Sequence, residues 1–239
     1  MSDRLQQLAA STLGALILLF TAWVYWPGQA GPALLDDATS VLVIGDLKNH
    51  PELAWDYILG DNSGPLGRPV SMASFVLEKV FLDGELETSK RVNILLHLFN
   101  GALVMWLFWL LFRFLGTPGY RVLAVVMGAA WLLSPLYVST VLYVVQRMAM
   151  LSTTFMLCSC LCYLYWREKL RRGVFSVGLL ALLAILILLA VFAKENAVVV
   201  IPVLLLLEAL WLQFAGENGV TIRWLQRATL GLIALGGFA

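Results

Sequence analysis

The sequence predicts an all-α integral membrane protein with about seven transmembrane helices. Of its 239 residues, 61% are hydrophobic, whereas soluble domains are roughly 45–50% apolar. The mean hydropathy is +0.86. The apolar residues gather in uninterrupted runs, the first of which covers 19 residues, 8–26. Because about 20 apolar residues are needed to cross the hydrocarbon core, such runs predict membrane spans and exclude an ordinary soluble fold.

Seven apolar runs follow one another along the chain. They cover residues 8–26, 94–112, 122 to about 136, 148–166, 174–192, 197–214 and 228–239. The first is longer than a usual signal-peptide core, so we expect an uncleaved span. Pro135 lies in the third apolar region, where proline ends or kinks a helix. The last run covers only 12 residues, so we expect residues 1–239 to be a single membrane domain of a longer protein.

The charges predict the orientation of these spans. Basic residues flank the short loops: Arg4; Arg113 and Arg121; Arg167, Lys169, Arg171 and Arg172; and Arg223 and Arg227. If the runs alternate, all of them lie on one side, which the positive-inside rule makes cytoplasmic, together with the N-terminus. The other side, periplasmic or lumenal, receives residues 27–91, which hold 10 of the 15 acidic residues. A net charge of +1 without a basic stripe argues against nucleic-acid binding.

The segment 27–91 is too long for a simple connector, and we expect it to be a partly helical extracytoplasmic loop. Apolar side chains in it repeat with helical spacing: Val70, Ala73, Leu77, Val80 and Phe81. This pattern predicts an amphipathic helix that lies along the membrane surface. A short helix packed on the protein's own core fits the same periodicity equally well.

A polar stripe marks the start of the second span. Lys90, Asn93, His97 and Asn100 are spaced so that they share one helix face, over about 15 Å along the axis. Lipid would leave these groups without hydrogen bonds, so the stripe must face protein, water or a ligand. A lone histidine is usually structural, but for His97 within such a stripe a functional role is equally compatible.

The alternation of spans brings further polar residues to the same membrane face. They are Asp36, Asp37, Arg68, Arg147, Lys194 and Glu195. Any one of them could be a local ion pair or a snorkelling side chain, but their shared side and depth predict a site. A carboxylate there can act as a general base, and basic groups can bind a lipid phosphate. This combination suits transfer of a sugar from a lipid-linked phosphate donor to an extracytoplasmic acceptor.

Metal chemistry has little support in the sequence. Asp36 and Asp37 could bind a divalent metal, but two adjacent carboxylates are a weak signal. Cys158, Cys160 and Cys162 lie inside one apolar run at a spacing that is neither a disulfide framework nor a zinc site. We therefore expect them to pack as small residues in a membrane helix.

Several short motifs occur in a recognisable order. They are Leu35-Asp36-Asp37, Arg68-Pro69, the segment 93–100, Ser134-Pro135, Gln146-Arg147, the segment 193–196 and Pro202. In this order the chain resembles, over roughly residues 8–210, the membrane half of the GT-C glycosyltransferases. Within that superfamily it looks similar to the protein O-mannosyltransferase-like branch that carries tetratricopeptide repeats after the membrane domain.

The resemblance implies a polyprenyl- or dolichyl-phosphate sugar donor and a protein or glycan acceptor. It implies that Asp36 or Asp37 is the catalytic base and that Arg68, Arg147 and Lys194 bind the phosphate. Asn93, His97, Asn100 and Glu195 would then line the cavity for donor or acceptor. Two other functions stay open: a non-catalytic subunit of a membrane complex that retains this fold, and a transporter of a lipid-linked sugar or an ion.

Overall fold

The computed structural model describes residues 3–37, 41, 47, 49–61, 64–82, 84–216 and 221–236. Helices make up 81% of the structure, and the described residues include no strand, apart from one isolated bridge between Ala215 and Thr221. The helical fold class is therefore confirmed.

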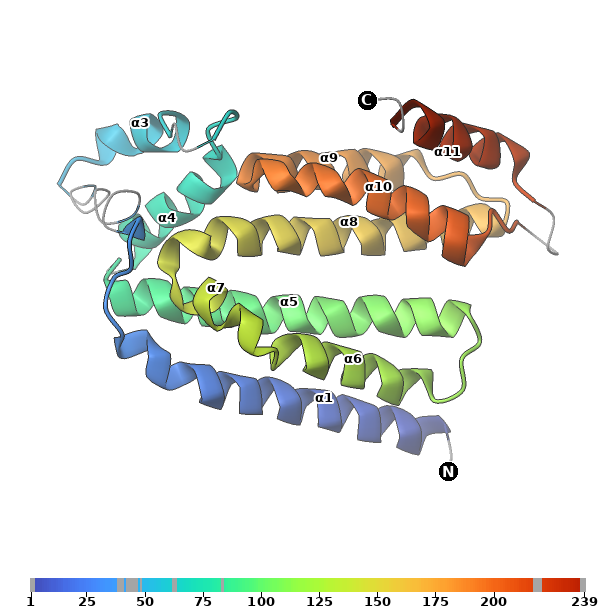
Figure 1. Ribbon diagram of the computed structural model, residues 1–239, viewed down its shortest axis with the longest axis horizontal. Coiled ribbons are helices and arrows are strands. Elements are labelled where there is room, and N and C mark those ends of the chain that lie inside the picture. Colours follow the sequence, from blue (N-terminus) through green and yellow to red (C-terminus); the bar gives the residue numbers. More distant parts are fainter. Residues whose placement is uncertain are drawn as a thin grey trace.

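Long antiparallel helices form the body of the molecule (Figure 1). They are α1 (Asp3–Tyr25) with its extension η1 (Trp26–Ala30), α5 (Leu86–Phe114), α6 (Tyr120–Leu132), α8 (Arg147–Arg171), α9 (Val177–Ala193) and α10 (Val200–Leu206). The short helix η6 (Glu195–Val199) precedes α10, and the π-helix η7 (Leu207–Leu212) follows it. The helices η3 (Pro51–Leu53), α3 (Ala54–Leu59) and α4 (Pro69–Phe81) lie at one end, while α11 (Arg223–Gly236) lies beside α10.

Four of these segments are long and apolar enough to cross a membrane. They are Arg4–Ala30, Leu86–Phe114, Val144–Arg171 and Glu195–Leu212. A fifth results if α6 and the helices after it are one bent span. The chain is thus a helical protein with four or five potential membrane spans. Helix α9 is apolar but has 17 residues, and α11 has 14, so the count of seven stays a prediction.

The break expected at Pro135 is present. Helix α6 ends at Leu132, and the chain continues through η4 (Pro135–Tyr137) and α7 (Val138–Leu142), bent by 46°. A third short helix, η5 (Val144–Gln146), leads into α8. Because proline lacks an amide hydrogen and clashes with the preceding turn, a helix cannot continue through it unbroken.

The predicted helix in the long loop is also present, as α4, but its buried face differs from the predicted one. Leu77, Val80 and Phe81 are exposed, whereas Met72 and Phe75 are buried. The buried face packs against α3, α8 and α9. One face of α4 thus packs on the protein, and the other presents apolar side chains at the end of the bundle. That this helix lies along the membrane surface stays a prediction.

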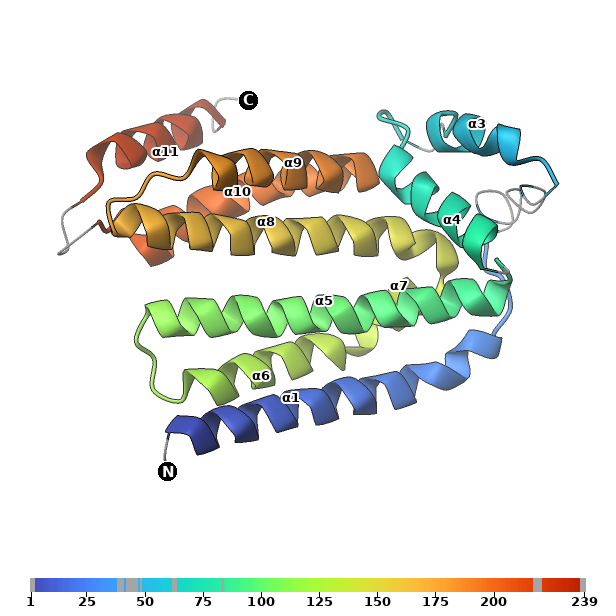
Figure 2. The ribbon, with the colours of Figure 1, turned by 180° about the vertical axis from the view of Figure 1, so that it is seen from behind.

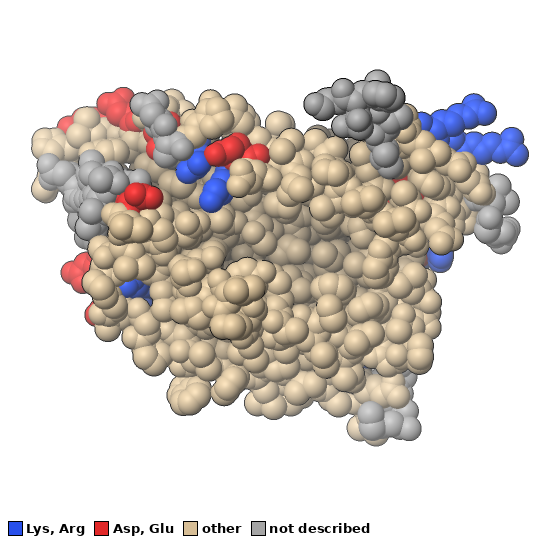
Figure 3. Space-filling view, in the orientation of Figure 1, with Lys and Arg blue, Asp and Glu red and all other residues tan. Residues whose placement is uncertain are grey.

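The charged residues lie at the two ends of the bundle. Figures 1 and 2 show α3, α4 and the α9–α10 junction at one end, which we call the α4 end. The N-terminus and the α5–α6 and α8–α9 turns lie at the other, the basic end, which carries Arg113, Arg121, Arg171 and Arg172. On the face shown in Figure 3, a broad uncharged belt separates the two groups of charges. This distribution is the one expected of a bundle that spans a bilayer.

Close packing of α5 on α6 generates a test of the fold. A Cβ atom on Gly101 would lie 2.3–2.7 Å from side-chain atoms of Leu132, which is fully buried. We expect Gly101→Ala to lower the free energy of unfolding by about 1–3 kcal/mol through overpacking. Thermal unfolding in detergent micelles measures this. Gly178→Ala is the control, because nothing lies within 4 Å of its Cβ position; equal stability of the two variants would contradict the packing described.

Candidate functional site

The helix break between α6 and α8 is held by the polar face of α5. The Asn93 side-chain amide donates to the carbonyls of Val141 and Val144, at 3.2 and 3.3 Å. Nε2 of His97 lies 3.0 Å from the carbonyl oxygen of Leu132, the last residue of α6. Interrupted helices leave carbonyls without intrahelical partners, and an apolar environment requires that these be satisfied within the protein. Asn93 and His97, two residues of the predicted stripe, therefore form hydrogen bonds with backbone carbonyls of the break.

The deeper part of the stripe joins α5 to α8. Asn100 donates to the carbonyl of Met150 at 2.9 Å and accepts a hydrogen bond from Thr154 at 2.6 Å. The His97 ring stacks on Trp131, with centroids 4.9 Å apart. Asn93, His97 and Asn100 are at most 2% exposed. These contacts assign the three side chains to helix packing, and their role in lining a cavity stays a prediction.

Arg147 is the centre of an enclosed network. Its Nη2 lies 2.6 Å from a carboxylate oxygen of Glu78 on α4 and donates to the Ser89 carbonyl at 2.9 Å. Its Nε donates to Asn93 at 2.9 Å, and the guanidinium lies 4.5 Å from the ring centroid of Phe75. Arg147 is only 1% exposed. It therefore links α4, α5 and α8, and a donor phosphate cannot reach it in this conformation.

The two adjacent aspartates lie in different environments. Asp37 is buried, and its carboxylate accepts hydrogen bonds from the amides of Val145 at 2.8 Å and Leu34 at 3.0 Å. Asp36 is exposed, and its own amide donates to the Tyr143 hydroxyl at 3.0 Å. Desolvation raises the pKa of Tyr143; the hydrogen bond from the Asp36 amide opposes this rise, and the Asp36 carboxylate adds to it. Asp37 thus fixes the backbone, which leaves Asp36 as the accessible carboxylate.

Lys90 positions the segment that carries the aspartates. Its Nζ donates to the carbonyls of Gly31 and Pro32, at 2.6 and 2.8 Å, and the residue is 2% exposed. Its positive charge also interacts with Asp37. The first residue of the predicted stripe therefore ties the chain after η1 to α5.

A second, more exposed charge group lies where α4 meets the start of η6. Arg68 forms a bidentate pair with Glu195, at 2.7 and 3.0 Å, and its Nη1 lies 3.5 Å from the sulfur of Met148. Hydrogen bonding to Glu195 raises the pKa of Arg68. Figure 3 shows basic and acidic atoms side by side over this junction. The pair is partly open to solvent, with side chains 15% and 26% exposed.

Lys194 lies next to this pair. In the described part of the chain its side chain forms no ion pair or hydrogen bond. Burial lowers the pKa of Lys194, and the nearby Arg68 charge lowers it further, while Glu195 opposes both. A partly buried cation without a fixed partner is a suitable binding group for an anion.

The structure places most of the predicted residues at the α4 end, with Asn100 at the middle of α5, and separates them into two groups. Asp37, Asn93, His97, Asn100 and Arg147 are enclosed, whereas Asp36, Arg68, Lys194 and Glu195 are partly or fully exposed. Asp37 contacts Val145, and Arg68 contacts Met148. Both groups are therefore positioned by the same short stretch of chain. We call the exposed members the exposed polar group.

Two contributors were missed in the sequence. Glu78 is the counter-ion of Arg147, and Tyr143 contacts Asp36. The stretch 75–81 is apolar except for Glu78 and Lys79, and a carboxylate there is a usable signal, because an unpaired charge is costly on a buried face. Within the regions that the structure describes, no group of three or more potential metal ligands occurs.

Comparison with known proteins identifies no relative. No family model, no curated protein and no solved structure matches this chain. The functional argument therefore depends on the residues themselves.

The enclosed pair predicts a large effect on stability. Glu78→Ala leaves the buried Arg147 charge without its counter-ion, and we expect a loss of about 3–5 kcal/mol. Glu87→Ala is the matched control, because the Arg91–Glu87 pair has side chains 45% and 52% exposed, so less than about 1 kcal/mol is expected. Thermal unfolding of the purified variants distinguishes the two; similar losses would show that Arg147 is not enclosed as described.

Proposed function

We propose that this protein is a GT-C-type membrane glycosyltransferase that moves a sugar from a polyprenyl- or dolichyl-phosphate donor to an acceptor hydroxyl. The observation that supports this most directly is the exposed polar group at the α4 end. It combines an accessible carboxylate, Asp36, with the cations Arg68 and Lys194. A base and phosphate-binding groups at one end of a membrane bundle are the parts that such a transfer needs.

In the proposed reaction the acceptor oxygen attacks the anomeric carbon of the donor sugar. The bond from that carbon to the phosphate oxygen breaks, and the lipid phosphate leaves. Asp36 takes the proton of the acceptor hydroxyl as general base. Lys194, and Arg68 held by Glu195, stabilise the negative charge that develops on the departing phosphate. The acceptor belongs to a protein or a glycan.

The enclosed residues have positioning roles in this proposal. Asp37 holds the amide of Val145, and Arg147 holds α4 through Glu78. These contacts keep Asp36 and Arg68 on a rigid support. A preorganised site avoids reorganisation during the reaction, which is the main source of electrostatic catalysis.

The proposal includes an orientation. Basic residues gather at the end opposite the exposed polar group, so the N-terminus lies in the cytoplasm and the site faces the periplasm or a lumen. In this proposal about seven spans of the chain cross the membrane. Cysteine labelling from one side of sealed vesicles tests this.

A second candidate function is a non-catalytic subunit of a membrane complex. The observation that favours it is the complete use of Asn93, His97 and Asn100 in helix packing. In that case the polar residues stabilise the fold, and removal of Asp36 has no effect on any transfer reaction.

Asp36→Asn distinguishes the two candidates. We expect the full-length protein in liposomes to lose roughly 100- to 10,000-fold of its sugar transfer, which is the usual contribution of a general base. The measurement is transfer of radiolabelled sugar from a polyprenyl- or dolichyl-phosphate donor to protein and glycan acceptors. Asp56→Asn, in α3 at the same end, is the control. Unchanged transfer in Asp36→Asn would exclude this base, and sugar flux without acceptor modification would indicate a transporter.

Lys194→Gln tests phosphate binding. Loss of the cation should raise KM for the lipid-phosphate donor about tenfold, because a charge-assisted bond to phosphate is lost. Arg91→Gln is a suitable control, since Arg91 already pairs with Glu87 and Gln29 at the same end. An unchanged donor KM in a folded Lys194→Gln protein would remove Lys194 from the site.

A further inference from the structure

A large groove lies at the basic end, away from the exposed polar group. It has a volume of about 790 Å³ and runs between α1, α5 and α6. Small residues line much of this groove. They are Gly14 and Ala15 on α1, Ala102 on α5 and Ala124 on α6. Alanine and glycine at these positions leave room that larger side chains would fill.

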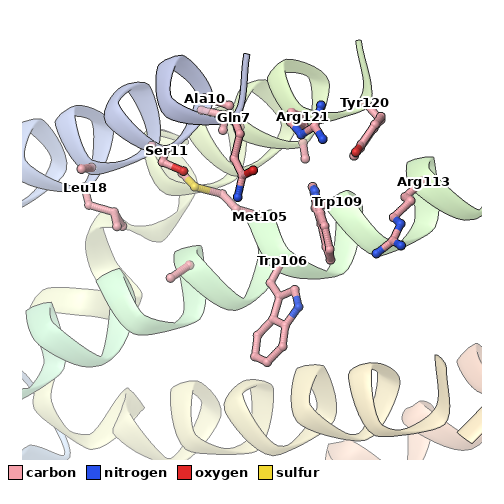
Figure 4. A pocket seen from close by; sticks show the side chains of 15 residues that line it. Gln7, Ala10, Ser11, Leu18, Met105, Trp106, Trp109, Arg113, Tyr120 and Arg121 are labelled. Carbon is pink, nitrogen blue, oxygen red and sulfur yellow. The ribbon is translucent and has the colours of Figure 1, made fainter. Parts of the chain in front are cut away.

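The two ends of the groove differ in polarity. Figure 4 shows Gln7, Arg113, Tyr120 and Arg121 around one end and Leu18 at the other. From Gln7 to Leu18 the groove follows eleven residues of α1, or about 16 Å. This is close to the depth of one leaflet, which is about half of the 30 Å hydrocarbon core.

The polar end of the groove is positively charged. The Arg113 guanidinium lies 5.3 Å from the ring centroid of Trp109, and that of Arg121 lies 4.7 Å from the ring centroid of Tyr120. Both arginines line the groove, and no acidic side chain is among the described residues that line it. An occupant that matches this charge has an anionic head and an apolar tail.

We propose that this groove binds one anionic phospholipid from the leaflet at the basic end. The phosphate of its headgroup lies between Arg113 and Arg121, with Gln7 and Tyr120 as further hydrogen-bond donors. One acyl chain extends along Gly14 and Ala102 toward Leu18. Basic pockets between membrane helices on the cytoplasmic side are typical sites for anionic headgroups. The site lies at the end opposite Asp36, so it does not depend on the proposed transfer reaction.

The test is native mass spectrometry of the full protein from vesicles that contain equal amounts of phosphatidylglycerol and phosphatidylcholine. We expect one retained phosphatidylglycerol per protein. The double variant Arg113→Gln/Arg121→Gln should lower its occupancy roughly tenfold or more. Ser11→Phe, which places a ring in the groove, should lower it without a change in charge.

Matched controls keep the test specific. Arg4→Gln/Arg223→Gln removes two positive charges from the same end at positions that do not line the groove, and should leave occupancy unchanged. Circular dichroism confirms that each variant is folded. Equal retention of the two lipids, or an equal loss in the control variant, would overturn the proposal. So would competition by soluble glycerol phosphate as strong as by the lipid, because the acyl chain would then contribute nothing.

Discussion

The helix break between α6 and α8 must have its freed backbone groups bound by side chains of other segments, which are α5 and the chain at Asp37. The carbonyls of Leu132 and Val141 lie at the C-terminal ends of α6 and α7, and both residues are fully buried. Other protein groups must therefore satisfy these carbonyls. Asn93 and His97 donate to these carbonyls from α5. The other two residues of the stripe donate elsewhere, Lys90 to Gly31 and Pro32 and Asn100 to Met150, so each polar group that would be costly against lipid has a protein partner. Carbonyls without helical partners and polar side chains in an apolar environment are each unfavourable alone. Their hydrogen bonds to one another remove both penalties and hold α5 against the break.

The same break also positions both groups of the site. The Asp37 carboxylate accepts a hydrogen bond from the amide of Val145. Arg147 donates a hydrogen bond to Asn93 and forms an ion pair with Glu78 on α4. A second enclosed pair, Arg167 with Glu208 at 2.6 Å, holds the other end of α8. Buried ion pairs contribute little net stability, but separating the two partners is costly. Each pair therefore fixes how the two helices that carry it are placed against each other. Helix α8 is therefore fixed at both ends, and the exposed polar group lies on a rigid support.

Spacing along the sequence was sufficient to predict which residues share a face, but not what they contact. The stripe from Lys90 to Asn100 and the break at Pro135 were both predicted, because each depends on local geometry alone. The partners of the stripe could not be predicted, since the freed carbonyls are known only once the break has folded back on α5. For α4, periodicity indicated the helix but not its buried face, because Phe75 and Glu78 turn inward to meet Arg147.

The distribution of burial at the α4 end separates polar residues that are enclosed in the fold from polar residues that are open to solvent. Asp36 and Lys194 have similar polarity to Asp37 and Arg147, yet only the first two are accessible to a substrate. The enclosed, ion-paired charge of Arg147 has little capacity to bind an external group, because protein atoms surround it and most of its hydrogen bonds are already made. A substitution in the enclosed network must therefore act through stability, whereas one in the exposed polar group can alter binding or chemistry in a protein that remains folded. Comparison of stability with activity for Asp37 and Asp36 variants thus separates support from catalysis, even though the two residues are adjacent in the chain.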